Sequence, residues 1–258
     1  VLKFYFNRNS ILLESLTNDE NVVTNTAYFF VALIPYVFLW GKRKLISVGS
    51  LILLMFFIIQ GAKRGALITG AVGALVFIYY QLITTDPKRR LQTFIMSLIT
   101  TILLIFFSYK YYISNDFLVN RIQQIESGGS GRDVIYSNLL SNWYEAESII
   151  NQLFGFGFVS TIKYSGTGNL AHNDWLELLT NFGLFGVFIY LFIYFLGFYF
   201  TFNSKVKKEY KIIVFAIMSM GFMQTLFSMY YTSSFTILAS VLLGYIFGTH
   251  QYNKKLEK

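Results

Sequence analysis

The sequence lacks cysteine and is poor in charge. None of its 258 residues is cysteine, which excludes disulfides and thiolate metal sites. Charged residues make up 13% of the chain, against about 25% in soluble domains, so polar surface is too scarce for a water-exposed globule of this size. His172 and His250 are the two histidines, and the spacing of a helical zinc motif is absent. We therefore expect no metal ion and no other cofactor.

Hydrophobic residues, by contrast, make up 55% of the chain and gather in long runs. Several runs approach the roughly 20 residues that a helix needs to cross a bilayer. The sequence predicts an all-α fold: a polytopic transmembrane helix bundle with a partly helical extracytoplasmic loop. The predicted helices cover residues 26–41, 45–60, 66–83, 91–112, 175–202, 211–230 and 233–248.

The basic residues predict how these helices are oriented. Short clusters at 42–44, 86–90, 203–211 and the tail hold 13 of the 21 Lys and Arg residues, and such clusters mark cytoplasmic loops. The net charge of +8 is thus mainly a topology signal, and we expect no nucleic-acid partner. The predicted organisation is an extracytoplasmic segment (1–25), four transmembrane helices (26–112), an extracytoplasmic loop (113–172), three transmembrane helices (173–249) and a cytoplasmic tail (250–258).

The polar first 25 residues resemble a loop arriving from an earlier part of a protein. No basic, apolar and small-residue signal pattern follows Val1. We therefore expect the chain to be the carboxyl-terminal part of a longer membrane protein.

The long loop contains a predicted amphipathic helix. Its apolar residues recur with the spacing of one helix face and would lie on the membrane surface or over the ends of the other helices. The glycines of "FGFGF", which follows, allow tight turns and close backbone approach. The apolar positions are Ile135, Leu139, Trp143, Ala146, Ile150 and Leu153.

Two arginines on the extracytoplasmic side are candidates for anion binding. Arg64 lies in "QGAKRGAL", a predicted hairpin between two spans, and Arg132 opens the amphipathic helix. An arginine fork matches phosphate oxygens and stays charged. Each arginine could also have no binding role, with Arg64 simply a loop-flanking residue and Arg132 a solvated charge. A cation at a helix start is slightly unfavourable, so an anionic partner of Arg132 is expected: Asp133, Glu126 or a phosphate.

His172 precedes a long apolar run in "GNLAHNDWLELLTNFGLFG". One interpretation is that "HND" simply caps a helix that begins near Trp175, and the other is that His172 is a general base near neutral pH. Asp174 and Glu177 have the spacing of a capping box, which favours a structural role for these carboxylates and leaves His172 outside the helix, facing the loop.

Taken together, these motifs resemble the O-antigen ligase / O-antigen polymerase family of bacterial envelope glycan enzymes. Lys63 stands where the family more often has Ser, and several amino-terminal spans of the family are missing. The matching stretches cover about residues 20–190 and read "NVVTNTAYFFVALIP", "KRGAL", "SGRDVIYSNLLSNWYEAESIINQLFGFGF" and "AHNDWLELLTNFGLFGVFIYL".

The resemblance implies transfer of a glycan from a polyprenyl diphosphate carrier to an acceptor sugar hydroxyl. The donor would be a polyprenyl-diphosphate-linked glycan and the acceptor a glycan or glycolipid. The enzyme would cross the bacterial cytoplasmic membrane several times, with its active site on the extracytoplasmic face. Arg64 and Arg132 would bind the diphosphate, His172 would be the base, and Trp143 and Tyr164 would contact sugars.

Three alternatives stay open at this point. A polysaccharide polymerase of the same family has the same motifs as a ligase. A transporter or flippase of lipid-linked sugars fits the polytopic pattern, although transporters usually keep ionisable groups deep in the membrane. A non-catalytic scaffold would use the loop for docking.

Overall fold

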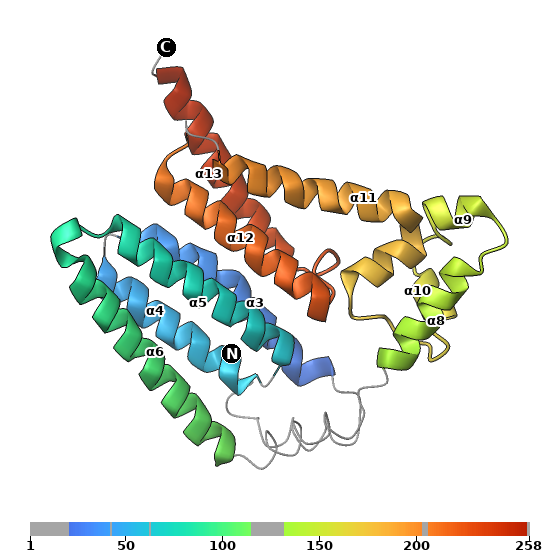
Figure 1. The fold of residues 1–258 in the computed structure, drawn as a ribbon, viewed down its shortest axis with the longest axis horizontal. Helices are drawn as coiled ribbons and strands as arrows, with labels where there is room; N and C mark the ends of the chain where they lie inside the picture. The colour runs from blue at the N-terminus through green and yellow to red at the C-terminus, as the bar shows by residue number, and fades with distance from the viewer. Residues whose placement is uncertain (1–20, 42, 62, 115–131, 203–205, 257–258) are drawn as a thin grey trace. The chain divides into compact units, whose positions relative to one another are not determined.

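The fold is described by a computed structural model that covers residues 21–41, 43–61, 63–114, 132–202 and 206–256. No strand occurs within these ranges, which confirms the predicted all-α class for this part of the chain (Figure 1). The α-helices are α3 (Asn21–Val37), α4 (Lys44–Gln60), α5 (Arg64–Thr84), α6 (Arg90–Ile113), α8 (Arg132–Tyr144), α9 (Ile149–Phe154), α10 (Ser160–Tyr164), α11 (Asp174–Phe202), α12 (Lys208–Phe227) and α13 (Thr236–Leu256), with 3₁₀ turns η1 (Phe38–Trp40) and η2 (Pro87–Arg89).

Each of the seven predicted apolar segments falls on a helix. Over the described residues, three helices are long and apolar enough to cross a membrane: α5, α11 and α12. Two further apolar helices, Thr26–Trp40 and Lys44–Gln60, are shorter. These helices indicate a membrane protein, while the seven passes and their orientation stay predictions.

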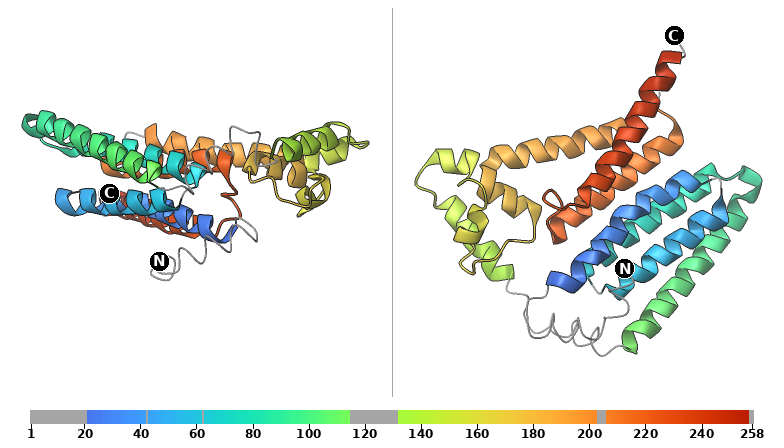
Figure 2. Two further views of the ribbon diagram at one scale, coloured as in Figure 1. Left: turned by 90° about the horizontal axis from the view of Figure 1, so that it is seen from below. Right: turned by 180° about the vertical axis from the view of Figure 1, so that it is seen from behind.

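The chain divides into two compact units. Unit 1 comprises residues 1–101 and 234–258, and unit 2 comprises residues 102–233. In unit 1, α3 packs against α4, α5 and α13 (Figure 2). Ile34 and Ile58 are fully buried between these helices, and the Tyr36 hydroxyl donates to the carbonyl oxygen of Leu238 at 2.6 Å. Apolar contacts and a few side-chain hydrogen bonds of this kind thus hold the helices of unit 1 together.

In unit 2, α11 and α12 pack side by side, and α8, α9 and α10 lie against the first part of α11 (Figure 1). Ile135 and Leu139 of α8 are buried against Ala171, so the first half of the predicted amphipathic stripe does face the protein.

The second half of that stripe was predicted wrongly. The helix ends at Tyr144, and α9 begins at Ile149. The Ser148 hydroxyl oxygen accepts a hydrogen bond from the Ile150 amide at 3.2 Å and so caps a new helix. Since α9 starts afresh, its apolar residues do not continue the buried face of α8, and Ile150 and Leu153 are exposed.

The helix α11 breaks at Gly183, whose φ of 64° and ψ of −162° are not helical. The Thr180 carbonyl accepts from the Phe156 amide at 2.8 Å, and the Asn181 carbonyl accepts from the Gly157 amide at 3.1 Å. The part after the break, residues 184–202, has 19 residues and a length of about 28 Å. That length matches the roughly 30 Å hydrocarbon core of a bilayer.

Two glycines make this break possible. A Cβ on Gly155 would overlap the carbonyl carbon of Asn181, and a Cβ on Gly183 would overlap the carbonyl carbon of Leu153. Both glycines also have positive φ, 78° and 64°. The close backbone approach expected of "FGFGF" is therefore confirmed at Gly155.

Gly155→Ala is expected to destabilise the protein by about 2–5 kcal/mol, since it combines the strain of a positive φ, about 1–2 kcal/mol, with a backbone overlap that costs about 1–3 kcal/mol. Gly157→Ala is the matched control, because Gly157 also has positive φ but no heavy atom near the added Cβ. Thermal unfolding in detergent would measure both, and equal losses would contradict the proposed overlap.

Candidate functional site

The start of α11 is capped by Asn173. Its Oδ1 accepts hydrogen bonds from the amides of Trp175 at 3.0 Å and Leu176 at 3.2 Å. The amide of Glu177 bonds to the Asn173 carbonyl at 3.0 Å. The cap expected within "HND" is therefore confirmed, and Asn173 holds the N-cap position. The capping box predicted for Asp174 and Glu177 is wrong, and both carboxylates have other partners.

Asp174 joins α11 to the chain that follows α12. Its side chain is fully buried. Its Oδ1 accepts from the Tyr230 amide at 2.8 Å, and its Oδ2 accepts from the Tyr231 amide at 3.0 Å and the Tyr190 hydroxyl at 2.9 Å. A buried carboxylate needs such donors, because burying it without partners would cost several kcal/mol. Asp174 thus fixes the segment 228–233 against α11.

The Tyr231 phenol lies beside this carboxylate group. Burial raises the pKa of Tyr231 above its ordinary value, and the negative charges of Glu177 and Asp174 raise it further, although a hydrogen bond with Asn181 opposes the increase. The phenol therefore stays protonated at neutral pH and acts as a hydrogen-bonding group.

His172 is held in a left-handed backbone conformation. Its φ is 52°, which costs a non-glycine residue about 1–2 kcal/mol and persists only where the surroundings impose it. On one side, the buried Glu177 accepts from the Ala171 amide through Oε1 at 2.6 Å. On the other side, Asn173 caps α11. Glu177 and Asn173 therefore fix the backbone on either side of the half-buried His172.

Arg132 and the His172 loop meet at the same end of α12. Arg132 donates from Nη1 to the carbonyl oxygen of Phe227 at 3.4 Å. Asn173 donates from Nδ2 to the preceding carbonyl, that of Leu226, at 3.3 Å. These are the last carbonyls of α12, where the helix dipole is negative. Arg132 and Asn173, the residue after His172, thus bond to the same helix end within unit 2.

This arrangement also accounts for a cation at the start of α8. The partners expected for Arg132 were Asp133, Glu126 or a phosphate. The partner seen is a carbonyl at a helix carboxyl terminus, which favours a positive charge. Asp133 is exposed, and Glu126 lies outside the described residues. A guanidinium carries five N–H donors, so the bond to Phe227 uses one of them.

Arg64 is the first residue of α5 and is exposed. The predicted hairpin is present, since α4 ends at Gln60 and α5 begins at Arg64. The Lys63 ammonium lies 5.3 Å from the centre of the Tyr28 ring. Arg64 belongs to unit 1, whereas Arg132 and His172 belong to unit 2, so their meeting in one site stays a prediction.

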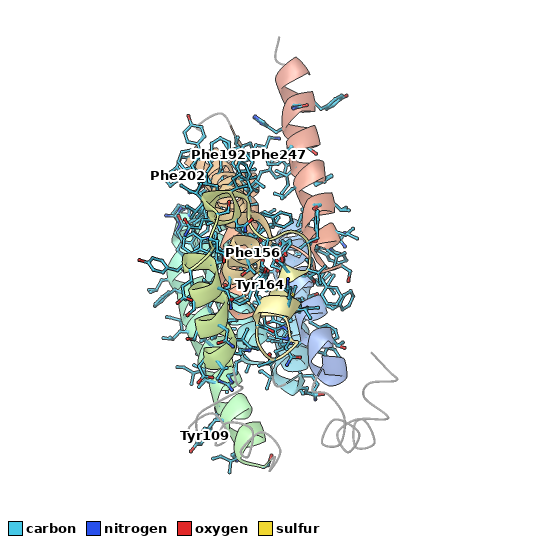
Figure 3. The ribbon with its side chains drawn as sticks, turned by 90° about the vertical axis from the view of Figure 1, so that its right-hand side faces the viewer. Tyr109, Phe156, Tyr164, Phe192, Phe202 and Phe247 are labelled. Carbon is cyan, nitrogen blue, oxygen red and sulfur yellow. The ribbon has the colours of Figure 1, made fainter. Side chains whose placement is uncertain are left out.

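The two predicted sugar contacts, Trp143 and Tyr164, take part in packing within unit 2. Trp143 donates from Nε1 to the Gln152 carbonyl at 3.1 Å, which ties α8 to α9. The Tyr164 ring centre lies 4.4 Å from that of Phe156, and Figure 3 labels both residues. Both rings are half-buried. Contact with a sugar stays a prediction for each.

Sequence reasoning missed the hydrogen-bond partners of Asp174. Tyr190 lies about four turns along α11, and Tyr230 and Tyr231 lie beyond α12. One signal was available: an Asp at the start of a long apolar helix needs a donor. Within the described ranges, no group of three His, Asp or Glu side chains could hold a metal ion.

Comparisons with known protein families, with curated proteins and with solved structures find no match to this chain. A functional assignment therefore depends on the sequence motifs and on the geometry around Arg132, His172 and Asp174.

Asp174→Ala is expected to cost about 3–5 kcal/mol of stability, because it leaves two amides and one hydroxyl buried without an acceptor. Asp174→Asn keeps one carbonyl oxygen and the side-chain volume, so we expect a loss of about 1–2 kcal/mol. The control is Asp133→Ala at an exposed position, with an expected change within about 0.5 kcal/mol. Unfolding midpoints in detergent would test this order, and similar midpoints for all three would contradict the role of Asp174.

Proposed function

We propose that the chain is an O-antigen ligase-like glycosyltransferase of the bacterial cytoplasmic membrane. It transfers a glycan from a polyprenyl diphosphate carrier to a sugar hydroxyl of a glycan or glycolipid acceptor. In this proposal all seven apolar helices cross the bilayer, and the segment 113–172 faces the extracytoplasmic side. The sequence motifs support the reaction class, and three apolar helices support the membrane location.

The proposal rests on one observation. The last carbonyls of α12 accept hydrogen bonds both from Arg132 and from Asn173 in the loop of His172. The permanently charged guanidinium of Arg132 then bonds to the same helix end as Asn173, which directly follows His172 in the chain. Arginine suits diphosphate oxygens because its planar donors bind two oxygens at once. Histidine suits proton removal near neutral pH.

The reaction in this proposal has one bond formed and one broken at the anomeric carbon of the donor sugar. The acceptor hydroxyl oxygen forms a bond to that carbon, and the bond from the carbon to the diphosphate oxygen breaks. His172 accepts the hydroxyl proton as general base. Arg132, with Arg64 as its predicted partner, stabilises the negative charge that develops on the departing polyprenyl diphosphate.

The left-handed backbone of His172 supports a functional role. Strained non-glycine residues cluster at sites where a side chain must be aimed. Here the flanking contacts of Ala171 and Asn173 hold the backbone, so the surrounding fold sets the left-handed conformation of His172. A simple helix cap would not need this, because Asn173 already caps α11.

His172→Ala is expected to lower the transfer rate by about 10²–10⁴-fold, the usual effect of a lost general base, and Arg132→Ala by about 10²–10³-fold through weaker leaving-group stabilisation. Transfer of glycan from a purified polyprenyl diphosphate donor in proteoliposomes would measure this. The matched controls are His250→Ala and Arg89→Ala, which change the same residue types elsewhere. Near-normal transfer by both site variants would contradict the assignment.

His172→Gly separates the proposed base from a structural role. Glycine adopts positive φ without strain, so the variant is expected to match or exceed the parent in stability by up to about 1 kcal/mol. Its transfer rate should nevertheless fall as far as that of His172→Ala, because the imidazole is missing. Retained transfer in His172→Gly would show that only the backbone conformation matters.

The lipid-linked species that accumulates in a deletion strain distinguishes the ligase from a polymerase. A missing ligase leaves full-length chains on the carrier, and a missing polymerase leaves single repeats.

A further inference from the structure

The short helix α9 exposes its apolar side chains and turns its polar ones toward the protein, the opposite of a helix on the surface of a water-soluble protein. Its apolar residues Ile149, Ile150, Leu153 and Phe154 are all exposed, with Ile149 and Ile150 at 68% and 63% of their full surface. Its polar residues Asn151 and Gln152 are the less exposed ones. The side chain of Gln152 donates from Nε2 to the Tyr144 carbonyl at 3.0 Å, and the backbone carbonyl of Gln152 accepts from Trp143 Nε1. In water, the apolar side would face the core instead.

The turn that follows α9 extends this apolar surface. Phe158 is 85% exposed, and Val159 and Ile162 are also exposed. The run "IINQLFGFGFVSTI" at 149–162 contains no charged residue. An exposed patch of this kind on a folded surface marks an interaction site. We call residues 149–162 the apolar turn.

The apolar turn is continuous with the candidate membrane-spanning part of α11. The Phe154 ring centre lies 5.7 Å from that of Phe185, just after the break in α11. The Phe158 ring meets Phe182 edge-on with centres 5.0 Å apart. From Leu184 onward, α11 exposes large apolar side chains along most of its length, and Figure 3 labels two of them, Phe192 and Phe202. One apolar surface therefore runs from α11 onto the apolar turn.

From this geometry we propose that the apolar turn is embedded in the interfacial layer of the lipid bilayer, with Ile150 and Phe158 among the acyl chains. The occupant of the surface is lipid, because the same surface continues along a helix that is long and apolar enough to span the membrane. Tyr144, whose carbonyl accepts from Gln152, and Lys163, which follows Ile162 in the chain, are exposed, and both residue types serve as anchors at the membrane interface. The proposal requires membrane insertion only and does not depend on the glycan-transfer function.

The absence of cysteine from the chain permits a direct test. Single substitutions Ile150→Cys and Phe158→Cys would each carry a nitroxide spin label in the full chain, reconstituted in bilayers of phosphatidylethanolamine and phosphatidylglycerol. Ser141→Cys and Asn169→Cys, at exposed polar positions of unit 2, are the matched controls. Collision with oxygen, which partitions into lipid, and with a water-soluble nickel chelate would be measured at each position.

Labels at Ile150 and Phe158 are expected to collide several-fold more with oxygen than with the nickel chelate, and the two controls should show the reverse. Nickel accessibility at Ile150 and Phe158 equal to that at the controls would overturn the proposal. Dipolar broadening between labels, with low accessibility to both reagents, would also overturn it, because a second copy of the chain would then cover the surface. If either variant fails to fold, Ile149→Cys and Val159→Cys replace it and are judged in the same way.

Discussion

At Gly183 the backbone of α11 leaves the helical conformation, and the carbonyls of Thr180 and Asn181 accept hydrogen bonds from Phe156 and Gly157. Polar backbone groups removed from water need such partners, so the break and the turn after α9 require each other. The contact is tight enough that only glycine fits at position 155. The position of α9 beside α11 follows from this pairing, and with it the outward orientation of the apolar turn.

The break also divides α11 into two parts of different chemistry. Before it, Asp174, Glu177, Thr180 and Asn181 are all buried, and protein groups serve as partners of the two carboxylates and of Asn181. After it, the helix is almost wholly apolar and largely exposed. The polar part fixes the His172 loop and the segment that follows α12, whereas the apolar part is suited to lipid. A helix without this break would hold both parts on one axis, so they could not be oriented independently.

The sequence predicted the helices well because apolar runs of this length have few alternatives to a helix. It placed Arg132 and His172 on one side of the membrane, which stays a prediction; in the structure Arg132 and Asn173, the residue after His172, bond to the last carbonyls of α12. It failed where a local pattern had two interpretations: the spacing of Asp174 and Glu177 imitates a capping box, while Asn173 is the cap. The bonds of Asp174 to residues near position 230 depend on tertiary packing, which single-sequence patterns do not encode.

The proposed donor, with its polyprenyl tail and charged diphosphate, would require a protein surface that changes from apolar to polar over a short distance. In unit 2 that change occurs within α11, between the exposed apolar residues after Gly183 and the buried polar residues before it. The helical part before the break, residues 174–182, is about 14 Å long, and the His172 loop lies at its polar start. A diphosphate bound there would have its lipid tail within reach of the apolar turn. A mutation that straightened α11 would therefore separate the lipid-facing surface from the charged one, even with every candidate site residue intact.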